Sequence, residues 1–390
     1  MLTSCNVCES KDLTDIWDLP NFPLTGIYVD RPDEVNYQNT YPQKLQFCTN
    51  CSHAQLANQI DPSFLYRDTY THRTSESPIS ASGNKFLLDF ILSKTNGKNF
   101  QQVLEIGCND LLLLQNLRDR TQNQAGVDPI WPDGIHVSEQ GIRLWGGFAE
   151  SANYSELLKH KIDLIISAHT FEHVLNPKKA ILSLQDQISE DCLLIIEVPS
   201  AERMLEQRRL DQVFNQHVNY YSVRSLETLM KPLGFNLVDL EYNYSYWGGT
   251  QLLVFSRDIN SHNDLVRPHL TTEAYKESIV DFEAAMRNAS SQIENSHGPV
   301  YLYGAAQMLP SLIYHLTDSA LRKITGIIDD NPARQGKFYP NFGLKISSSD
   351  RLFDLEQSTI VVSALDSARP ILRRLIELKP RTIIIPSGLI

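Results

Sequence analysis

Four cysteines stand in two closely spaced pairs, Cys5-x-x-Cys8 and Cys48-x-x-Cys51. Two such loops can surround a zinc ion tetrahedrally, with Zn–S distances of about 2.3 Å. Because four sulfur ligands leave no coordination position open, the spacing predicts a structural zinc site and not a catalytic one. A redox Cys-x-x-Cys pair is the alternative, but that motif typically begins a helix in a βαβ unit. His53, close to the second pair, is expected to pack or form hydrogen bonds and not to bind the metal.

A second set of polar residues follows two apolar runs. Glu105-Ile106-Gly107-Cys108-Asn109-Asp110 stands where the first expected strand turns into a helix. Ligands of open α/β sheets bind beyond the carboxyl ends of the strands, and Gly107 lets the backbone approach a ligand closely. Asp128 ends the second strand, where an acid accepts hydrogen bonds from ribose hydroxyls. The segment from His169 to His173 ends a later strand above the same crevice. The predicted cofactor-binding residues are Glu105, Gly107, Asn109, Asp110, Asp128 and His169.

The residues after the glycine indicate which cofactor fits the crevice. A nicotinamide dinucleotide site would need a Gly-x-Gly-x-x-Gly run to bind the pyrophosphate, but Leu111 through Leu114 follow here. S-adenosylmethionine carries no phosphate, so the sequence favours this methyl donor. An ordinary α/β turn followed by buried leucines is the alternative.

These residues need a sheet with helices on both faces to bring them together. A helix is expected near Ser80 to Ser93, where Phe86, Leu87 and Phe90 recur at helical spacing. Strands are expected at 103–106, 125–128, 164–167, 193–198 and 251–256, the last of them antiparallel. Alternation of strands and helices predicts an α/β fold with a parallel, doubly wound sheet.

The chain is expected to contain three domains. Residues 1–72 lack a long periodic stretch and suit a small, loop-rich zinc-binding domain. Residues 73–258 are expected to form the Rossmann-like methyltransferase domain. Residues 259–390 begin with a polar linker and a long helix, and they should form a C-terminal Rossmann-like domain. Its strands are expected at 300–304, 324–329, 359–363 and 382–385.

Composition restricts the partners and the location. The chain has 390 residues and a formal net charge of −11, which argues against nucleic-acid binding, because phosphate neutralisation needs clustered Lys and Arg. A nucleotide-linked substrate stays compatible, since it needs only a few local cations or helix N-termini.

No apolar run reaches the roughly 20 residues of a membrane span, and the first residues do not read as a signal peptide. We therefore expect a cytoplasmic protein, and its oligomeric state stays open between monomer and dimer.

Further motifs follow one another along the chain. They are Cys48-Thr49-Asn50-Cys51-Ser52-His53-Ala54-Gln55-Leu56, the stretch around Tyr66 and Tyr70, Gly126-Val127-Asp128-Pro129, Gln216-His217-Val218-Asn219-Tyr220-Tyr221-Ser222, Gly248-Gly249-Thr250, Tyr303-Gly304-Ala305 and Asp330-Asn331-Pro332-Ala333-Arg334-Gln335-Gly336. With the first cysteine pair and the glycine turn, and in this order, they make the chain resemble the sugar C-methyltransferases of deoxysugar biosynthesis.

The resemblance implies a reaction and the residues that perform it. Such enzymes use S-adenosylmethionine and a nucleotide-linked keto sugar; a base removes the proton beside the ketone, and the enolate takes the methyl group. The base needs a pKa near neutral, and hydrogen-bond donors must face the developing oxyanion. His217 matches the family's catalytic histidine and is the predicted base, His173 matches a second pocket histidine, and Tyr70 lies in the substrate-contacting stretch. The family's C-terminal domain contributes to substrate binding, which adds Tyr303 and Gly304 as candidates.

Several residues depart from the family pattern. Leu111 replaces a glycine and is expected to narrow the donor pocket, and Phe214-Asn215-Gln216 replaces Tyr-His-Glu. Phe214 lacks a hydroxyl donor, and Gln216 has no negative charge to raise the basicity of His217. These changes keep two alternatives open: an O-methyltransferase of a sugar or polysaccharide precursor, and a non-catalytic binding protein on the same scaffold.

Overall fold

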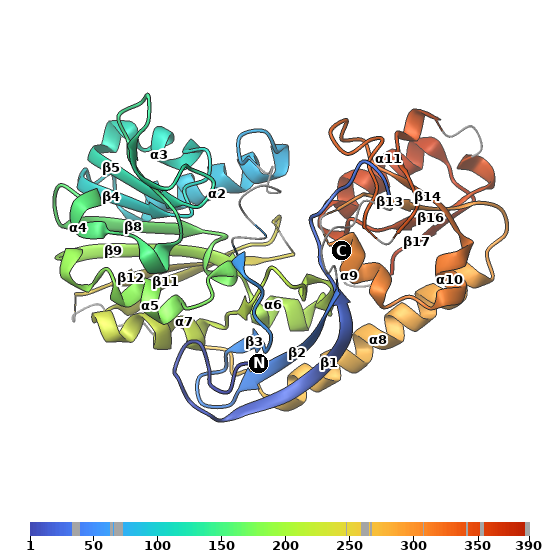
Figure 1. Cartoon of the computed structure of the whole chain (residues 1–390), viewed down its shortest axis with the longest axis horizontal. Helices are drawn as coiled ribbons and strands as arrows, with labels where there is room; N and C mark the ends of the chain where they lie inside the picture. Colours follow the sequence, from blue (N-terminus) through green and yellow to red (C-terminus); the bar gives the residue numbers. More distant parts are fainter. Residues whose placement is uncertain are drawn as a thin grey trace. The chain divides into compact units, whose positions relative to one another are not determined.

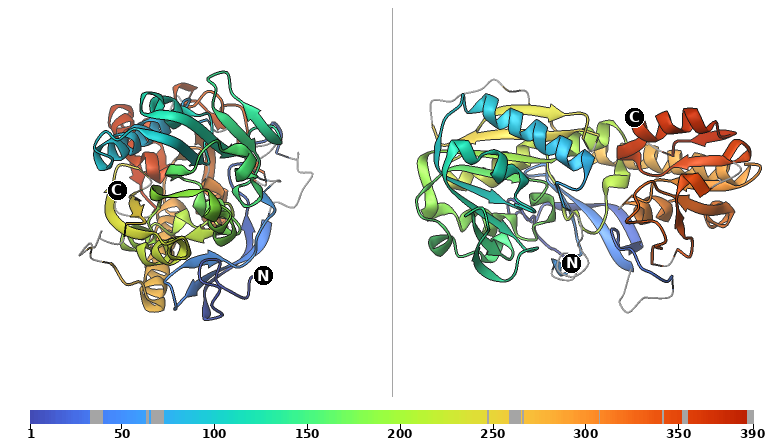
Figure 2. Two further views of the ribbon diagram at one scale, coloured as in Figure 1. Left: turned by 90° about the vertical axis from the view of Figure 1, so that its left-hand side faces the viewer. Right: turned by 90° about the horizontal axis from the view of Figure 1, so that it is seen from above.

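The computed structural model describes residues 1–32, 40–62, 65, 73–246, 248–258, 265, 267–306, 308–340, 342–351 and 355–386. The chain divides into two compact units, each assembled from three segments. The first unit contains residues 1–15, 46–203 and 218–271, and the second contains residues 16–45, 204–217 and 272–390 (Figure 1; Figure 2). The domain boundaries at residues 72 and 258 stay a prediction.

An eight-stranded sheet forms the centre of the first unit, with the order β11-β12-β9-β8-β4-β5-β7-β6. Its strands are β4 (Phe100–Ile106), β5 (Thr121–Asp128), β6 (Gly134–Val137), β7 (Arg143–Gly146), β8 (Ile162–Ala168), β9 (Ile188–Pro199), β11 (Asn236–Asn243) and β12 (Thr250–Ser256). The strands from β7 to β9 in this order are parallel, whereas β12 is antiparallel to β9 and β11, and β6 is antiparallel to β7. The chain runs outward from β4 through β5 and returns to β8 on the other side of β4. Ligands of open α/β sheets bind at such a switch point.

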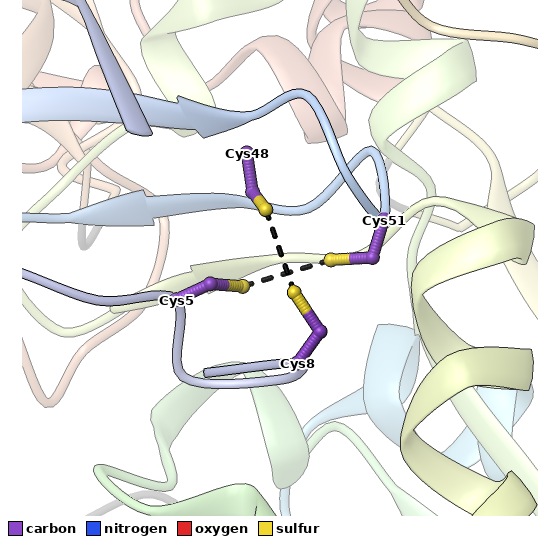
Figure 3. A group of neighbouring side chains, drawn as sticks. All are labelled: Cys5, Cys8, Cys48 and Cys51. Carbon is purple, nitrogen blue, oxygen red and sulfur yellow. Dashed lines mark hydrogen bonds between the residues drawn. The ribbon is translucent and has the colours of Figure 1, made fainter. Parts of the chain in front are cut away.

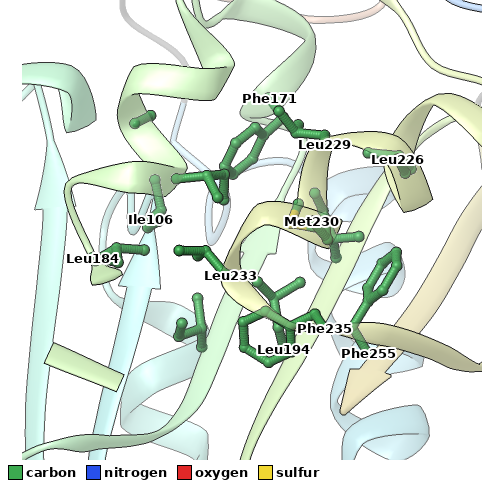
Figure 4. Close-up of a cluster of buried hydrophobic side chains, with 14 of the residues drawn as sticks. Ile106, Phe171, Leu184, Leu194, Leu226, Leu229, Met230, Leu233, Phe235 and Phe255 are labelled. Atoms are coloured by element: carbon green, nitrogen blue, oxygen red, sulfur yellow. The ribbon is translucent and has the colours of Figure 1, made fainter. Parts of the chain in front are cut away.

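Helices cover both faces of this sheet. They are α2 (Pro78–Lys94), α3 (Leu112–Asn116), α4 (Tyr154–Leu157), α5 (Pro177–Leu182), α6 (Ala201–Glu206) and α7 (Val223–Met230). On one face, α2 contributes Leu87 and Phe90 to a buried cluster. On the other face, α7 contributes Leu226 and Leu229 to a second buried cluster that also contains Phe171 (Figure 4). The predicted doubly wound α/β fold is confirmed.

A separate four-stranded sheet has the order β1-β2-β3-β10. Its strands are β1 (Leu13–Pro23), β2 (Thr40–Cys48), β3 (Ala54–Leu56) and β10 (Asn219–Tyr220). β1 and β2 occupy a segment that was expected to be rich in loops, and for β2 buried polar residues explain the difference. Gln43 and Gln46 are both buried in β2. Gln43 Nε2 donates to Asn215 Oδ1 at 3.0 Å, and Gln46 Nε2 donates to Asp15 Oδ1 at 2.9 Å.

The second unit contains a five-stranded parallel sheet with the order β15-β14-β13-β16-β17. Its strands are β13 (Val300–Tyr303), β14 (Ile324–Ile328), β15 (Ile346–Ser347), β16 (Thr359–Val362) and β17 (Thr382–Ile384). The helices are α8 (Thr272–Glu294), α9 (Leu309–Tyr314), α10 (Asp318–Lys323) and α11 (Ala368–Leu378). The predicted second α/β set is therefore present. Within the described part of the chain, no helix has the length and apolar character needed to span a membrane.

Candidate functional site

The four paired thiols converge in the first unit (Figure 3). The Sγ atoms of Cys5 and Cys51 lie 3.6 Å apart, and those of Cys8 and Cys48 lie 3.5 Å apart. Four sulfurs at about 2.3 Å from a tetrahedral zinc ion are separated by roughly 3.8 Å, so the thiols need to move by only a few tenths of an ångström to bind it. A metal requires the thiolate form of these side chains, so zinc binding should release protons from the site.

A pocket opens at the carboxyl ends of β4, β5, β8 and β9. It encloses about 1180 Å³ with its open mouth included, somewhat more than the roughly 300–1,000 Å³ typical of small-molecule sites. All the residues predicted to bind the cofactor line this pocket, and so does His173. Glu197 and Tyr246 line it as well, although neither was expected from the sequence. The one sequence signal for Glu197 is its place as the only acid in the apolar run 193–198.

The glycine turn brings backbone close to the pocket. Gly107 has a φ of 82°, and a Cβ atom at this position would lie 1.8 Å from Thr170 Oγ1. The N–H groups of Gly107 and Cys108 both donate to the carbonyl of Val127, at 2.8 and 3.3 Å. A larger residue at position 107 would therefore displace the segment that follows β8, which explains the requirement for glycine in physical terms.

The backbone holds the carboxylate of Asp128 in a fixed orientation. Its Oδ2 atom accepts from the N–H of Asn109 at 2.8 Å, and its Oδ1 atom accepts from the N–H of Ile130 at 3.0 Å. Burial raises the pKa of Asp128, while these two backbone N–H groups oppose that shift. Each oxygen keeps a lone pair for a hydroxyl donor such as a ribose hydroxyl.

Glu105 supplies a buried acceptor on the floor of the pocket. Its Oε2 atom has no hydrogen-bond partner among the residues that the structure describes. Burial, with smaller effects from Asp128 and Asp110, raises the pKa of Glu105 to about 8. An unpaired buried carboxyl oxygen is costly. Glu105 therefore fits a ligand that brings a cation or an N–H donor, and the methyl donor brings both in its ammonium group.

Asn109 and Asp110 connect the glycine turn to the segment before α2. Asn109 Oδ1 accepts from the N–H of Thr74 at 3.0 Å, and Asp110 Oδ2 accepts from the hydroxyl of Ser75 at 2.6 Å. Leu111 does not narrow the pocket as expected, because its side chain lies in the buried cluster against α2 and not among the lining residues. Its φ of 69° is in the left-handed region that a glycine adopts without strain.

His169 lies between two buried carboxylates. Its Nδ1 atom is 3.3 Å from Glu172 Oε1, and its Nε2 atom is 3.8 Å from Glu197 Oε1. The ring packs edge-on against Tyr246 with centroids 4.9 Å apart. Burial alone would lower the pKa of His169, but Tyr246, Glu172 and Glu197 raise it well above its ordinary value. Thr250 completes the group, since its hydroxyl donates to Glu197 Oε1 at 2.5 Å.

The two histidines predicted to be catalytic belong to different units of the chain. His173 ends the short 3₁₀ turn Phe171–His173 and belongs to the first unit. His217 belongs to the second unit, is 3% exposed, and its ring centroid lies 4.0 Å from that of Phe214. Tyr70 lies outside the described residues. The assignment of these residues to catalysis stays a prediction.

The residues before His217 are hydrogen-bonded within the second unit. Thr25 donates from Oγ1 to Gln216 Oε1 at 2.5 Å, and Gln216 Nε2 donates to the Thr25 carbonyl. Asn215 Nδ2 donates to the carbonyls of Phe22 and Pro23 at 3.3 and 2.8 Å. Both amide side chains therefore hold the β1 segment and its continuation.

Family models match two parts of the chain. Residues 79–240 match the model described as "Methyltransferase domain", and residues 5–66 match the model described as "Putative zinc binding domain". The chain thus carries a methyltransferase domain behind a zinc-binding domain, and the predicted cofactors S-adenosylmethionine and zinc are confirmed.

Methyltransferases are among the relatives that align with this chain. The C-methyltransferase NovU of Streptomyces niveus is 23% identical over 269 residues, which are 68% of this chain and 63% of NovU. The ubiquinone biosynthesis O-methyltransferase of Aeromonas salmonicida (strain A449) is 24% identical over 105 residues, which are 26% of this chain and 44% of that protein. The chain thus spans less than two thirds of the length of these relatives.

Solved structures of methyltransferases are also similar. The N-methyltransferase NodS of Bradyrhizobium japonicum WM9, in complex with S-adenosylhomocysteine, aligns with a TM-score of 0.35 and 14% identity over 46% of this chain and 88% of NodS. An S-adenosylmethionine-dependent methyltransferase of Clostridium acetobutylicum ATCC 824 aligns with a TM-score of 0.34 and 17% identity over 44% of this chain and 91% of that structure. The fold assignment rests on the strand order and on the family models.

Proposed function

We propose that this chain transfers a methyl group from S-adenosylmethionine to a nucleotide-linked keto-deoxysugar, at the carbon beside the ketone. The observation that carries the proposal is the pocket at the switch between β4 and β8, whose buried polar atoms suit the methyl donor. The alignment with a C-methyltransferase over 68% of the chain supports carbon as the acceptor atom. The bound donor supplies an electrophilic methyl group on a sulfonium sulfur.

The residues of the chain then provide the base and the acceptor site. His217 takes the proton beside the ketone, and it must be neutral to do so. His173 and Tyr70 contact the reacting sugar. Tyr303 and Gly304 are weaker candidates for binding the sugar; they lie at the carboxyl end of β13, where Tyr303 donates its hydroxyl to Asp330 Oδ2 at 2.5 Å. The three-domain division belongs to this proposal.

O-methylation is the second candidate, and a specific observation favours it. Gln216 and Asn215 are uncharged amides whose nitrogens donate to backbone carbonyls of the β1 segment and its continuation, so neither supplies a negative charge to raise the basicity of His217. A hydroxyl acceptor needs only one base. The curated O-methyltransferase relatives are consistent with this chemistry, although they match only 26% of the chain.

Product analysis distinguishes these candidates. Nucleotide-linked sugars are incubated with labelled donor, and the products are identified by mass spectrometry. With a substrate deuterated beside the ketone, C-methylation must lose the deuteron, whereas O-methylation retains it. Methylated product that keeps all its deuterium would overturn the carbon assignment. Absence of S-adenosylmethionine binding by calorimetry would instead support a non-catalytic scaffold.

His217→Asn tests the base. General-base catalysis typically contributes ~10²–10⁴-fold, so turnover should fall by about that factor while donor binding is unchanged. The exposed His160→Asn is the matched control. Turnover of His217→Asn within about twofold of the parent would reject this assignment and direct attention to His173.

We also propose a cytoplasmic location without nucleic-acid or membrane partners. All the cysteines are free, as in proteins of a reducing compartment, and the net charge of −11 disfavours binding to phosphate polymers. Whether the chain is a monomer or a dimer is a matter for sedimentation measurements.

A further inference from the structure

Strand β10, which pairs with the strand that follows the second cysteine pair, begins with a buried asparagine. Asn219 is 2% exposed and begins β10. β10 pairs antiparallel with β3, so Asn219 lies opposite Gln55 and Tyr220 lies opposite Ala54. β3 begins three residues after Cys51. The second zinc loop therefore leads directly into β3, the strand that pairs with Asn219 in β10.

On the side of the zinc site, the oxygen of this amide accepts from both cysteine loops. Asn6, between Cys5 and Cys8, donates from Nδ2 to Asn219 Oδ1 at 3.2 Å. His53, two residues after Cys51, has its Nε2 atom 3.1 Å from the same oxygen. Since an amide oxygen only accepts, His53 must carry its proton on Nε2. Asn219 thus contacts a residue of each cysteine pair's loop.

On the side of the pocket, the nitrogen of the same amide holds a turn. Asn219 Nδ2 donates to the carbonyls of Phe171 and Val174, at 3.1 and 2.7 Å. Those carbonyls bracket the turn Phe171–His173, and His173 lines the donor pocket. The amide of Asn219 therefore uses both its N–H donors and both acceptor positions of its oxygen. Its oxygen contacts the cysteine loops, and its nitrogen contacts the turn Phe171–His173. A fully satisfied buried polar network of this kind fixes the relative position of the groups that it joins.

We propose that Asn219 is a positioning residue that transmits the order of the zinc site to the turn carrying His173. The zinc then has a task beyond folding its own loops, because it holds one wall of the methyl-donor pocket. The catalytic meaning of this link rests on the proposed role of His173, whereas the link itself is measurable without any turnover. The backbone offers a parallel path, since Val218 N donates to the Glu172 carbonyl at 2.8 Å. Loss of the side chain should therefore loosen the turn without unfolding it.

Hydrogen exchange on the zinc-loaded protein tests this inference. Asn219→Ala removes the whole link, and the double variant Asn6→Ala/His53→Ala removes only its bonds to the zinc loops. Both should retain one zinc per chain, while amide exchange within 171–174 accelerates about tenfold or more and exchange in β4 and β8 is unchanged. Asn219→Asp keeps the acceptors but loses the donors to the turn, so it should behave like Asn219→Ala at 171–174. Once an acceptor is known, turnover should fall in the same order as the protection of the turn.

Asn50→Ala is the matched control. Asn50 is exposed, and its Nδ2 atom donates to Cys8 Sγ at 3.4 Å, so it contacts a predicted zinc ligand but is not one of the residues that join Asn219 to the zinc loops. This variant should leave exchange at 171–174 unchanged. Unaltered exchange in Asn219→Ala, or acceleration spread evenly over the first unit, would overturn the proposal. An unaffected turn in the Asn6→Ala/His53→Ala variant would show that the zinc loops do not act through Asn219. Altered exchange in a protein that transfers no methyl group would refute only the proposed function.

Discussion

Asp128 and Asp163 each accept hydrogen bonds from two backbone N–H groups. Asp128 lies at the carboxyl end of its strand, β5, and Asp163 lies at the amino end of its strand, β8. Asp163 accepts from the N–H groups of Gln101 and Gln102 at 2.8 and 3.0 Å, much as Asp128 accepts from two N–H groups beside the pocket. Only Asp128 lines the pocket. Asp128→Ala should weaken S-adenosylmethionine binding by ~1.5–3 kcal/mol, the range for hydrogen bonds to a charged group. Calorimetry measures this, and Asp163→Ala is the control that should retain full affinity.

A different residue, His169, makes stability depend on pH. Its pKa is raised above the ordinary value of about 6.5 by Tyr246, Glu172 and Glu197, against the effect of burial. A group whose pKa is higher in the folded chain contributes stability that is fully present below its unfolded pKa, and this contribution is lost as the pH rises through the folded pKa. The free energy of unfolding should therefore decline above about pH 6.5, and it should decline less in His169→Gln.

Urea denaturation between pH 6 and pH 9 provides the measurement for His169. The raised pKa of Glu105 also makes the free energy of unfolding depend on pH. The comparison with His169→Gln separates the contribution of His169 from that of Glu105. His160→Gln, on the exposed surface, should retain the pH dependence of the parent chain. If the free energy of unfolding changed with pH equally in the parent and in His169→Gln, the raised pKa of His169 would be contradicted.

At the scale of elements, the sequence predicted the strands that are continuous apolar runs. β4, β5, β8 and β9 were all expected, and their carboxyl ends bring the residues predicted to bind the donor to one pocket. β2 was missed, because Gln43 and Gln46 are buried and interrupt its apolar pattern. β1 was missed because Asp15, Asp18 and Asn21 interrupt its apolar residues. Glu197 was missed because its place beside His169 depends on the pairing of β8 with β9. Leu111 was misplaced, because its left-handed backbone directs the side chain into the core.

The turn between β4 and α3 permits a test that separates backbone strain from steric clash. Gly107 and Gly141 share a φ of 82°, but a Cβ atom at 107 would lie 1.8 Å from Thr170 Oγ1, whereas a Cβ atom at 141 would meet nothing within 4 Å. Gly141→Ala should cost ~1–2 kcal/mol of stability, the strain of a left-handed residue, and leave donor binding intact. Gly107→Ala carries the same strain and must also displace Thr170. It should lower donor affinity at least tenfold, and equal affinity in the two variants would show that the turn adapts.

For the molecule as a whole, the buried residues of the zinc loops pack in the same hydrophobic cluster as the large sheet of the first unit. Cys5, Val7 and Cys48 belong to the same buried cluster as Leu104 of β4 and Leu226 of α7. Metal binding to such a site contributes folding free energy. In this chain that contribution reaches the methyltransferase sheet through shared packing, so the metal should stabilise the first unit and not only its N-terminal segment.

Removal of one zinc ligand tests this coupling. Cys48→Ser should release the metal, since structural zinc sites have apparent binding energies of ~10–16 kcal/mol that depend on all their ligands. Because the loops share the core of the first unit, its thermal midpoint should fall by ~10 °C or more. Calorimetry and metal analysis of protein purified without chelator measure both effects.

Cys192→Ser is the control, because Cys192 is equally buried but lies apart from the zinc loops, in β9. It should keep one zinc per chain, and a parent chain that contains no zinc would reject the site itself. A midpoint unchanged in Cys48→Ser after loss of the metal would show that the sheet folds independently of the zinc loops.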